Sequence, residues 1–306
     1  MKLEAVIVCV NYSDFLAHTL PSTRNQFDKL VVVTDSKDND TKKLCEYYNV
    51  ECVQTDVFYE NGDAFNKGKG INAGLERLDL DGWVLHLDSD IYLPPQTRSI
   101  LENLPLDKEK IYGADRLMCP GYEDWTKFVD KPSPIQDSWI FIHLDRYPVG
   151  VRIAEYKTWH GGYEPIGYFQ MWNPVGSGVS QYPSKHGFAD RTDVLHCKKW
   201  SREKRELLPE IVVIHIESEA GIGLNWKGRK TPMFGPKASL PTLSWLDKLF
   251  LFLDKLSKCG YKPNRKISKE AKKESPSELE QGEIKVIGAG PIEGPLDESL
   301  EEWLRG

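Results

Sequence analysis

The sequence predicts an α/β fold with a mostly parallel central sheet and a smaller antiparallel part. Apolar runs suited to buried strands alternate with helical segments over residues 5–88. Strands that are separated by helices pair in parallel through right-handed crossovers. Polar side chains follow several of these runs, at the sheet edge where ligands bind in parallel α/β folds.

The elements of the first half are expected in a regular order. Strands are expected at residues 5–10, 29–35, 50–55 and 83–87, and helices at residues 15–20, 41–48 and 72–78. Pro21 should end or bend the first helix, because proline lacks the backbone donor that a helix interior requires. Residues 111–200 are rich in aromatic residues, glycine and proline. They predict an irregular, partly antiparallel half with strand-like runs at 139–142 and 167–172.

The chain divides into three parts. Residues 1–240 are expected to form the main domain. Residues 241–261 are expected to form an amphipathic helix, because apolar residues recur at helical spacing from Leu243 to Leu256. This helix is expected to dock on the domain or to mediate a homo-oligomer. Residues 262–306 are rich in Lys, Glu, Ser, Pro and Gly, a composition typical of a flexible charged tail.

Composition excludes several classes of protein. The net charge of −6 argues against a dedicated nucleic-acid binder, which is usually basic. The six cysteines contain no C-x-x-C pair, so the sequence predicts neither a zinc site nor a disulfide framework. The N-terminal run is too short for a signal peptide, and no stretch is long enough to span a bilayer. A cytoplasmic location is expected.

The most informative stretch is residues 83–93, where an apolar run ends in Asp88-Ser89-Asp90. Carboxylates beside a core strand are costly unless something pairs with them. A hard cation such as Mg²⁺ or Mn²⁺ suits this position, because it takes oxygen ligands and leaves positions open for phosphates. Taken alone, the Asp-x-Asp triplet fits an ordinary turn equally well. Asn11 and Asp35 follow two other predicted strands, which favours a shared site.

With these strand ends, the chain resembles the family 2 glycosyltransferases and their relatives with the Rossmann-like GT-A fold, over about residues 5–230. The resemblance implies metal-dependent transfer of a hexose from a nucleotide-diphosphate donor, with UDP expected, to a hydroxyl with inversion. It implies donor contacts from Asn11 and Tyr12 after the first strand, and from Asp35 after the second. Asp88 is implied to bind both donor and metal.

The segment 66–75 looks like the Gly-Lys-rich loop of that family, running into a helix with an asparagine. Lys69 and Asn72 are the donor-binding residues that the match implies. Glycines would let the backbone approach the donor, and a lysine beside a helix N-terminus favours phosphate. A plain glycine-rich turn is the alternative.

A histidine near the end of the catalytic domain is the third metal ligand in many GT-A enzymes. His215, in the apolar run 210–217, matches it, although a lone strand histidine is more often a satisfied core residue. The basic segment that follows, with Trp226, Lys227 and Arg229, resembles the loop that closes over the diphosphate in this family.

Inverting transfer needs a base that takes the proton of the acceptor hydroxyl. Asp190 matches the family position for this base, and Asp193 matches the acidic position that follows it. Ala189 stands where the family usually has an acid, which weakens the match. Either aspartate could instead cap a helix that begins near Val194.

Two other functional classes remain open at this stage. A nucleotidyltransferase shares the strand pattern and the carboxylate pair, but residues 10–14 lack the Gly-rich basic loop expected after its first strand. An inactive sugar-binding module is the other alternative, and the joint presence of Asp88, Asp90, Asp190 and His215 argues against it. The acceptor is left open among a glycan, a lipid, a protein and a modified nucleic-acid base.

Overall fold

The computed structural model describes residues 1–122, 125–126, 163–185, 187, 189 and 192–217. One of the chain's two compact units comprises residues 1–236 and 286–306, and it contains all the described residues. The second unit, residues 237–285, lies outside them. The predicted strand at 139–142, the helix at 243–256 and the tail from 262 also lie outside the described residues. These elements and the boundary at residue 240 therefore stay predictions.

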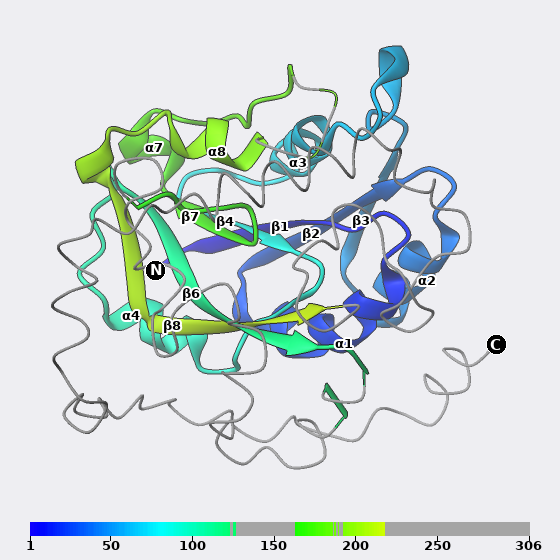
Figure 1. The fold of residues 1–306 in the computed structure, drawn as a ribbon, viewed down its shortest axis with the longest axis horizontal. Helices are drawn as coiled ribbons and strands as arrows, with labels where there is room; N and C mark the ends of the chain where they lie inside the picture. Colours follow the sequence, from blue (N-terminus) through cyan, green and yellow to red (C-terminus); the bar gives the residue numbers. More distant parts are fainter. Residues whose placement is uncertain (123–124, 127–162, 186, 188, 190–191, 218–306) are drawn as a thin grey trace, which may run out of the picture. The chain divides into compact units, whose positions relative to one another are not determined.

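The described strands form one mixed sheet. They are β1 (Leu3–Val8), β2 (Lys29–Asp35), β3 (Glu51–Thr55), β4 (Trp83–Asp88), β5 (Ile91–Tyr92), β6 (Ile111–Pro120), β7 (Phe169–Trp172) and β8 (Arg205–Glu217). Their order in the sheet is β3-β2-β1-β4-β7-β6-β8-β5 (Figure 1). β1 pairs in parallel with β2 and β4, and β2 with β3, whereas β7 runs antiparallel to β4 and β6. The predicted fold class is confirmed.

Helices cover both faces of this sheet. The α-helices are α1 (Ser13–Thr23), α2 (Asn39–Tyr47), α3 (Lys67–Leu75), α4 (Thr97–Asn103), α7 (Pro174–Ser177) and α8 (Thr192–Cys197), and the 3-10 helices are η1 (Arg24–Gln26), η2 (Glu60–Gly62) and η4 (Arg202–Lys204). In Figure 1, α3, α7 and α8 lie above the strands, and α1 and α4 lie below them.

The strands between these layers carry apolar side chains on both faces. Leu3, Ala5 and Ile7 of β1 pack with α1, α2 and α4, while Val6 and Val8 pack with α3 and α8. Successive side chains of a strand point to opposite faces. This alternation explains why a continuous apolar run, rather than an alternating one, marks the central strands.

Two of the predicted boundaries need correction at the start of the chain. β1 begins at Leu3 and ends at Val8, not at residues 5 and 10. α1 does not end before Pro21 but continues to Thr23. Phe15, Leu16 and Leu20 of α1 are fully buried, and this packing outweighs the hydrogen bond that Pro21 cannot donate near the C-terminal end of the helix.

The segment 66–75 also differs from its prediction. It is not a loop before a helix: α3 begins at Lys67, five residues earlier than expected, and contains the glycines. An added Cβ at Gly68 would lie 1.9 Å from the carbonyl oxygen of Pro183, and one at Gly70 would lie 2.1 Å from the Phe58 ring. The glycines therefore allow the helix to pack closely against its neighbours.

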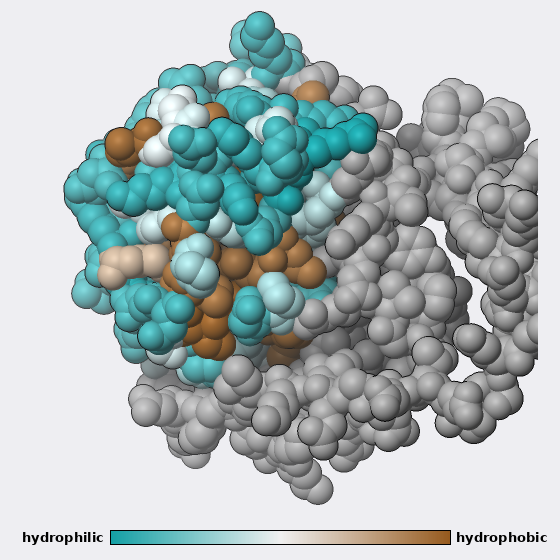
Figure 2. All heavy atoms as spheres, turned by 90° about the vertical axis from the view of Figure 1, so that its left-hand side faces the viewer, coloured by the Kyte–Doolittle hydropathy of each residue, from teal (hydrophilic) through white to brown (hydrophobic). Residues whose placement is uncertain are grey.

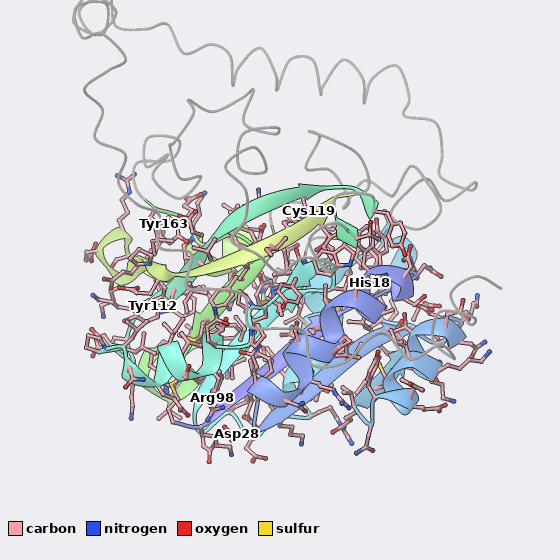
Figure 3. All side chains as sticks on the ribbon, turned by 90° about the horizontal axis from the view of Figure 1, so that it is seen from below. His18, Asp28, Arg98, Tyr112, Cys119 and Tyr163 are labelled. Carbon is pink, nitrogen blue, oxygen red and sulfur yellow. The ribbon has the colours of Figure 1, made fainter. Side chains whose placement is uncertain are left out.

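The surface of the described residues carries both hydrophobic and hydrophilic side chains. On the face seen in Figure 2, hydrophobic side chains gather in the middle and hydrophilic ones lie around them. Below the sheet, Arg98 and Asp28 lie close together (Figure 3), with Arg98 Nη1 3.1 Å from Asp28 Oδ2. Within the described part of the chain, no helix has both the length and the apolar character needed to cross a membrane.

Candidate functional site

The candidate site lies where β1, β2 and β4 end. These strands are parallel neighbours, so their carboxyl ends meet at one edge of the sheet, as the sequence predicted. Asn11 follows β1 in a left-handed conformation with φ of 57°, and Asp35 is the last residue of β2. Asp35 is buried, and its Oδ1 accepts a hydrogen bond of 2.9 Å from the backbone N–H of Lys37.

Asp38, which is not among the predicted site residues, holds the ends of β1 and β2 together. Its Oδ2 accepts hydrogen bonds from the backbone N–H of Asn11 at 2.5 Å and from Thr34 Oγ1 at 2.9 Å. Its Oδ1 accepts from the backbone N–H of Thr41 at 3.1 Å, which caps α2. The position of an aspartate three residues before Thr41, ahead of a helix, was the available signal for this cap.

Tyr12 lies between β1 and α1. Its ring stacks on that of Phe15, with the centroids 5.5 Å apart and an angle of 19° between the planes. The ring is half-buried and packs against the core below the sheet. Tyr12 is thus held at the strand end beside Asn11.

Asp88 ends β4 on the face toward α3, where it meets Lys67. Lys67 Nζ lies 2.5 Å from Asp88 Oδ1, and both side chains are partly exposed. Burial raises the pKa of the Asp88 carboxyl group, and the Lys67 ammonium group works against that shift. Burial lowers the pKa of Lys67, but Asp88 together with Asp193 and Asp90 raises it by more, so Lys67 stays charged.

Asp90 lies beside β8 and faces His215. β5, which follows Asp90, pairs antiparallel with β8 and sets Ile91 opposite His215. His215 Nε2 lies 3.3 Å from Asp90 Oδ2, and both side chains are almost fully buried. The backbone oxygen of Asp90 accepts a hydrogen bond of 2.9 Å from the N–H of Ile216. The structure therefore brings together two residues that lie far apart in the sequence.

Arg116 of β6 contacts the other nitrogen of this imidazole. Arg116 Nη1 lies 3.0 Å from His215 Nδ1. A guanidinium group can only donate, so we assign Nδ1 as the acceptor and place the ring proton on Nε2, directed at Asp90. Nε2 can bind a metal only after this proton has moved. The guanidinium also stacks over the Tyr168 ring, 4.5 Å from its centroid.

The donor groups at this edge suit a hard divalent cation. Two carboxylates and an imidazole are ligands that Mn²⁺ or Mg²⁺ accepts. In the arrangement described, however, Asp88 is turned to Lys67 and Asp90 to His215. Among the described residues, no group of three or more His, Cys, Asp or Glu side chains is gathered tightly enough to hold a metal ion. The chemical types of Asp88, Asp90 and His215 fit a divalent ion, but their present arrangement does not hold one. Asp88 would have to leave Lys67 to bind the ion.

The two predicted donor contacts on α3 have other partners. Lys69 Nζ lies 3.2 Å from Asp63 and 3.4 Å from Glu60. The Asn72 amide donates to the backbone oxygen of Tyr182 at 3.0 Å and accepts from its N–H at 2.7 Å. Asn72 thus fixes the segment around Tyr182, and Lys67 is the α3 lysine that reaches Asp88.

Asp193 lies in the first turn of α8, which begins at Thr192. Its Oδ2 accepts a hydrogen bond of 2.7 Å from the backbone N–H of Gly167, and its Oδ1 accepts one of 2.8 Å from that of Val194. The carboxylate thereby joins α8 to the segment before β7. Asp190, the predicted base, lies outside the described residues, as do Trp226, Lys227 and Arg229.

A buried aromatic and histidine cluster lies behind Asp88, on the α3 side of the sheet. His196 stacks on Tyr182 with centroids 4.0 Å apart, and His86 of β4 lies 5.5 Å from the same ring. Burial lowers the pKa of His86 and of His196 well below the ordinary range. Among the described residues, the ring nitrogens of both histidines have no hydrogen-bond partner. The cluster is therefore uncharged near neutral pH.

Comparison with known proteins gives one family match, over the first part of the chain. Residues 4–141 match the model described as glycosyl transferase family 2. No curated protein matches the chain. A solved structure of glucosyl-3-phosphoglycerate synthase from Mycobacterium tuberculosis with Mn²⁺, UDP-glucose and phosphoglyceric acid is 14% identical, with a TM-score of 0.42 over 85% of this chain and 80% of that one.

Two further solved structures are similar in parts. Another complex of the same synthase, with Mn²⁺, UDP and phosphoglyceric acid, is 17% identical, with a TM-score of 0.30 over 38% of this chain and 43% of that one. Mannosyl-3-phosphoglycerate synthase from Rubrobacter xylanophilus is 18% identical, with a TM-score of 0.41 over 72% of this chain and 67% of that one.

The family match and the fold agree. The match covers most of β1 and the strands up to β6, with Asp88 and Asp90 among them. The sheet is mostly parallel, with antiparallel pairings at β7 and β5, as the predicted fold requires. The family match over residues 4–141 and the described sheet thus agree on a glycosyl transferase family 2 domain in this part of the chain.

Proposed function

We propose that the protein transfers a hexose from a nucleotide-diphosphate donor, with UDP as the nucleotide, to an acceptor hydroxyl with inversion, and that it requires Mn²⁺ or Mg²⁺. The observation that carries this proposal is the pair Asp88 and Asp90 at the end of β4, inside the family match and beside Lys67 and His215. The acceptor stays open among a glycan, a lipid, a protein and a modified base.

Asp88, Asp90 and His215 are the residues proposed to hold the metal ion. When bound, the ion would neutralise the charge that develops on the leaving diphosphate. Asn11, Tyr12 and Asp35 are proposed to contact the nucleoside, since all three lie at the ends of β1 and β2. Asp38 would act on these contacts indirectly, because it holds the Asn11 backbone.

The diphosphate is proposed to meet positive charge from two directions. The N-terminus of α3 lies beside Asp88, and helix N-termini favour anions. Lys69 and Asn72, which the family resemblance placed at the donor, lie on the same helix. We propose that they support the donor site by holding Asp63 and the segment around Tyr182 against α3. Trp226, Lys227 and Arg229 are proposed to cover the diphosphate from the other side.

Asp190 is proposed as the base for the acceptor hydroxyl. Asp193 supports this division of roles, because both of its oxygens already accept backbone hydrogen bonds. A carboxylate whose two oxygens accept backbone hydrogen bonds is a weaker base, so Asp193 suits a structural role better than proton transfer. A cytoplasmic location is proposed as well, since the described cysteines are free thiols, as in reducing compartments.

Calorimetric titration of UDP with Mn²⁺ tests the proposed function. Asp90→Asn should abolish Mn²⁺-dependent UDP binding, while Asp79→Asn, an exposed carboxylate paired with Lys2, serves as the matched control and should bind as the wild type does. Hydrolysis of a panel of nucleotide sugars then identifies the donor. UDP and Mn²⁺ should also protect the chain near Trp226 from proteolysis. UDP affinity that is unchanged by Mn²⁺ and by Asp90→Asn would refute the metal site.

A further inference from the structure

Three carboxylates lie near Lys67, and one of them, Asp88, forms a short ion pair with it. Asp88, Asp90 and Asp193 all lie close enough to Lys67 to raise the pKa of its ammonium group. Of the bonds described for these carboxylates, only the one from Lys67 to Asp88 is a short ion pair with a lysine or arginine. Asp193 instead accepts two backbone N–H groups, and Asp90 lies against the neutral tautomer of His215. Lys67 is thus the cation that balances Asp88.

The backbone of Lys67 has little freedom to move. Lys67 is the first residue of α3, and Asn66 caps the helix by accepting a hydrogen bond of 3.0 Å from the N–H of Lys69. Asn66 is itself held by Asp63 at 2.8 Å and by the backbone oxygen of Ser184 at 2.9 Å. The next residue, Gly68, lies so close to Pro183 that even a methyl group would clash. Any movement of the ammonium group must therefore come from the flexible side chain.

A divalent ion and Lys67 compete for the same carboxylate. At 2.5 Å, Lys67 Nζ lies where an ion bound to Asp88 Oδ1 would repel it. Two cations that share one carboxylate oxygen repel each other, the more strongly the lower the local dielectric. A donor diphosphate would bring new negative charge to this edge, and a lysine next to a helix N-terminus is well placed to meet it.

We propose that Lys67 is a positioning residue that holds Asp88 before the donor arrives and moves its ammonium group to the donor diphosphate when a divalent ion takes Asp88. This exchange rests on the proposed function. It makes metal and nucleotide binding interdependent, because the ion alone must displace Lys67 whereas the ion with a diphosphate gives Lys67 a new partner. Lys67 would then weaken binding of the free ion and strengthen binding of the nucleotide.

Two affinities measured on Lys67→Met test this exchange. Binding of Mn²⁺ without nucleotide, followed by the electron paramagnetic resonance of free Mn²⁺, should tighten by about tenfold, the equivalent of one ion pair of about 1.4 kcal/mol. Binding of UDP at saturating Mn²⁺, followed by calorimetry, should weaken by about tenfold. Opposite changes are the distinguishing result, since damage to the fold would weaken both.

Lys110→Met is the control. It removes the same charge from an ion pair with Glu206 just before β6, away from the carboxyl ends of β1 and β4, and it should change Mn²⁺ affinity by less than about twofold. Lys67→Gln repeats the test with a polar neutral side chain. If wild-type protein binds UDP with Mn²⁺ but Mn²⁺ affinity is unchanged or weaker in both Lys67 variants, the exchange is wrong and the proposed function stands. If the wild-type protein binds neither UDP nor Mn²⁺, the exchange and the proposed function are both overturned.

Discussion

Replacing His196 by phenylalanine should make the protein less sensitive to acid. His196 is fully buried, stacks on Tyr182 at 4.0 Å and lies 4.6 Å from the Trp172 ring, so a phenylalanine ring can take its place in the stack. Burial lowers its pKa in the folded state, whereas in the unfolded chain it titrates near 6.5. The folded state therefore binds fewer protons, and stability is lost as the pH falls through about 6.5.

The size of this effect follows from proton linkage. A histidine that stays neutral when folded and has an unfolded pKa of about 6.5 costs about 1.4 kcal/mol of unfolding free energy between about pH 7.5 and about pH 5.5. Burial also lowers the pKa of His86 well below the ordinary range and that of His18 to about 4. Both histidines contribute to acid sensitivity in both proteins, so their effects cancel in the comparison. The difference between wild type and His196→Phe therefore isolates one residue.

Urea unfolding followed by tryptophan fluorescence at both pH values measures this difference. We expect His196→Phe to lose about 1.4 kcal/mol less than wild type on acidification. At the higher pH its stability should lie within about 1.5 kcal/mol of wild type, since the swap nearly conserves volume and removes two unpartnered nitrogens. Equal losses in the two proteins would show that His196 is not held neutral in the fold and would refute this account of the cluster.

Two further predictions concern α3 and the proposed base. Gly68→Ala should lower the unfolding free energy by about 2 kcal/mol or more, because its Cβ would meet the backbone of Pro183, whereas Gly62→Ala, with no atom within 4 Å, should cost only the strain of its φ of 81°. Urea titration compares the two, and equal costs would mean that α3 can shift. Asp190→Asn should keep UDP affinity and lose about a hundredfold to ten-thousandfold in turnover, with Asp193→Asn milder in a donor-hydrolysis and transfer assay. A dead Asp193 variant beside an active Asp190 variant would exchange the two roles.

The parallel half of the sheet could be predicted because its strands are buried on both faces. The strand expected at 29–35 is β2, Lys29–Asp35, and the one expected at 83–87 is β4, Trp83–Asp88. Burial on two faces requires unbroken apolar runs, and such runs are visible without knowledge of their partners. The order of β5 to β8 depends on contacts between distant segments, so only the existence of a partly antiparallel region could be predicted.

The start of α3 could not be predicted from local preferences. Gly68 and Gly70 have poor helix propensity, and a sequence pattern assigns them to a loop. They lie inside the helix because Pro183 and Phe58 occupy the space that side chains would need. The information that fixes this boundary is in the packing partners, one of which lies more than a hundred residues away in the chain.

The same boundary decides which lysine faces the carboxylates. If the helix began at Asn72, Lys69 would lie on the loop that approaches the donor. With the helix beginning at Lys67, residues 67 and 69 project in different directions around the helix, and it is Lys67 that contacts Asp88 while Lys69 contacts Asp63. An error of a few residues in a helix start thus changes the residue assigned to a site.

The alternation of β4 explains why Asp88 depends on a cation from outside its own strand. Leu85 and Leu87 face the α1 side of the sheet, so His86 and Asp88 both face α3. His86 Nε2 lies 3.7 Å from Asp88 Oδ1 and could neutralise it only if protonated. Burial and the charge of Lys67 both lower the pKa of His86, so it stays neutral. Lys67 of α3 is therefore the cation in direct contact with Asp88, and His215 acts on this carboxylate more weakly. Removing Lys67 should for this reason strengthen the binding of a divalent ion.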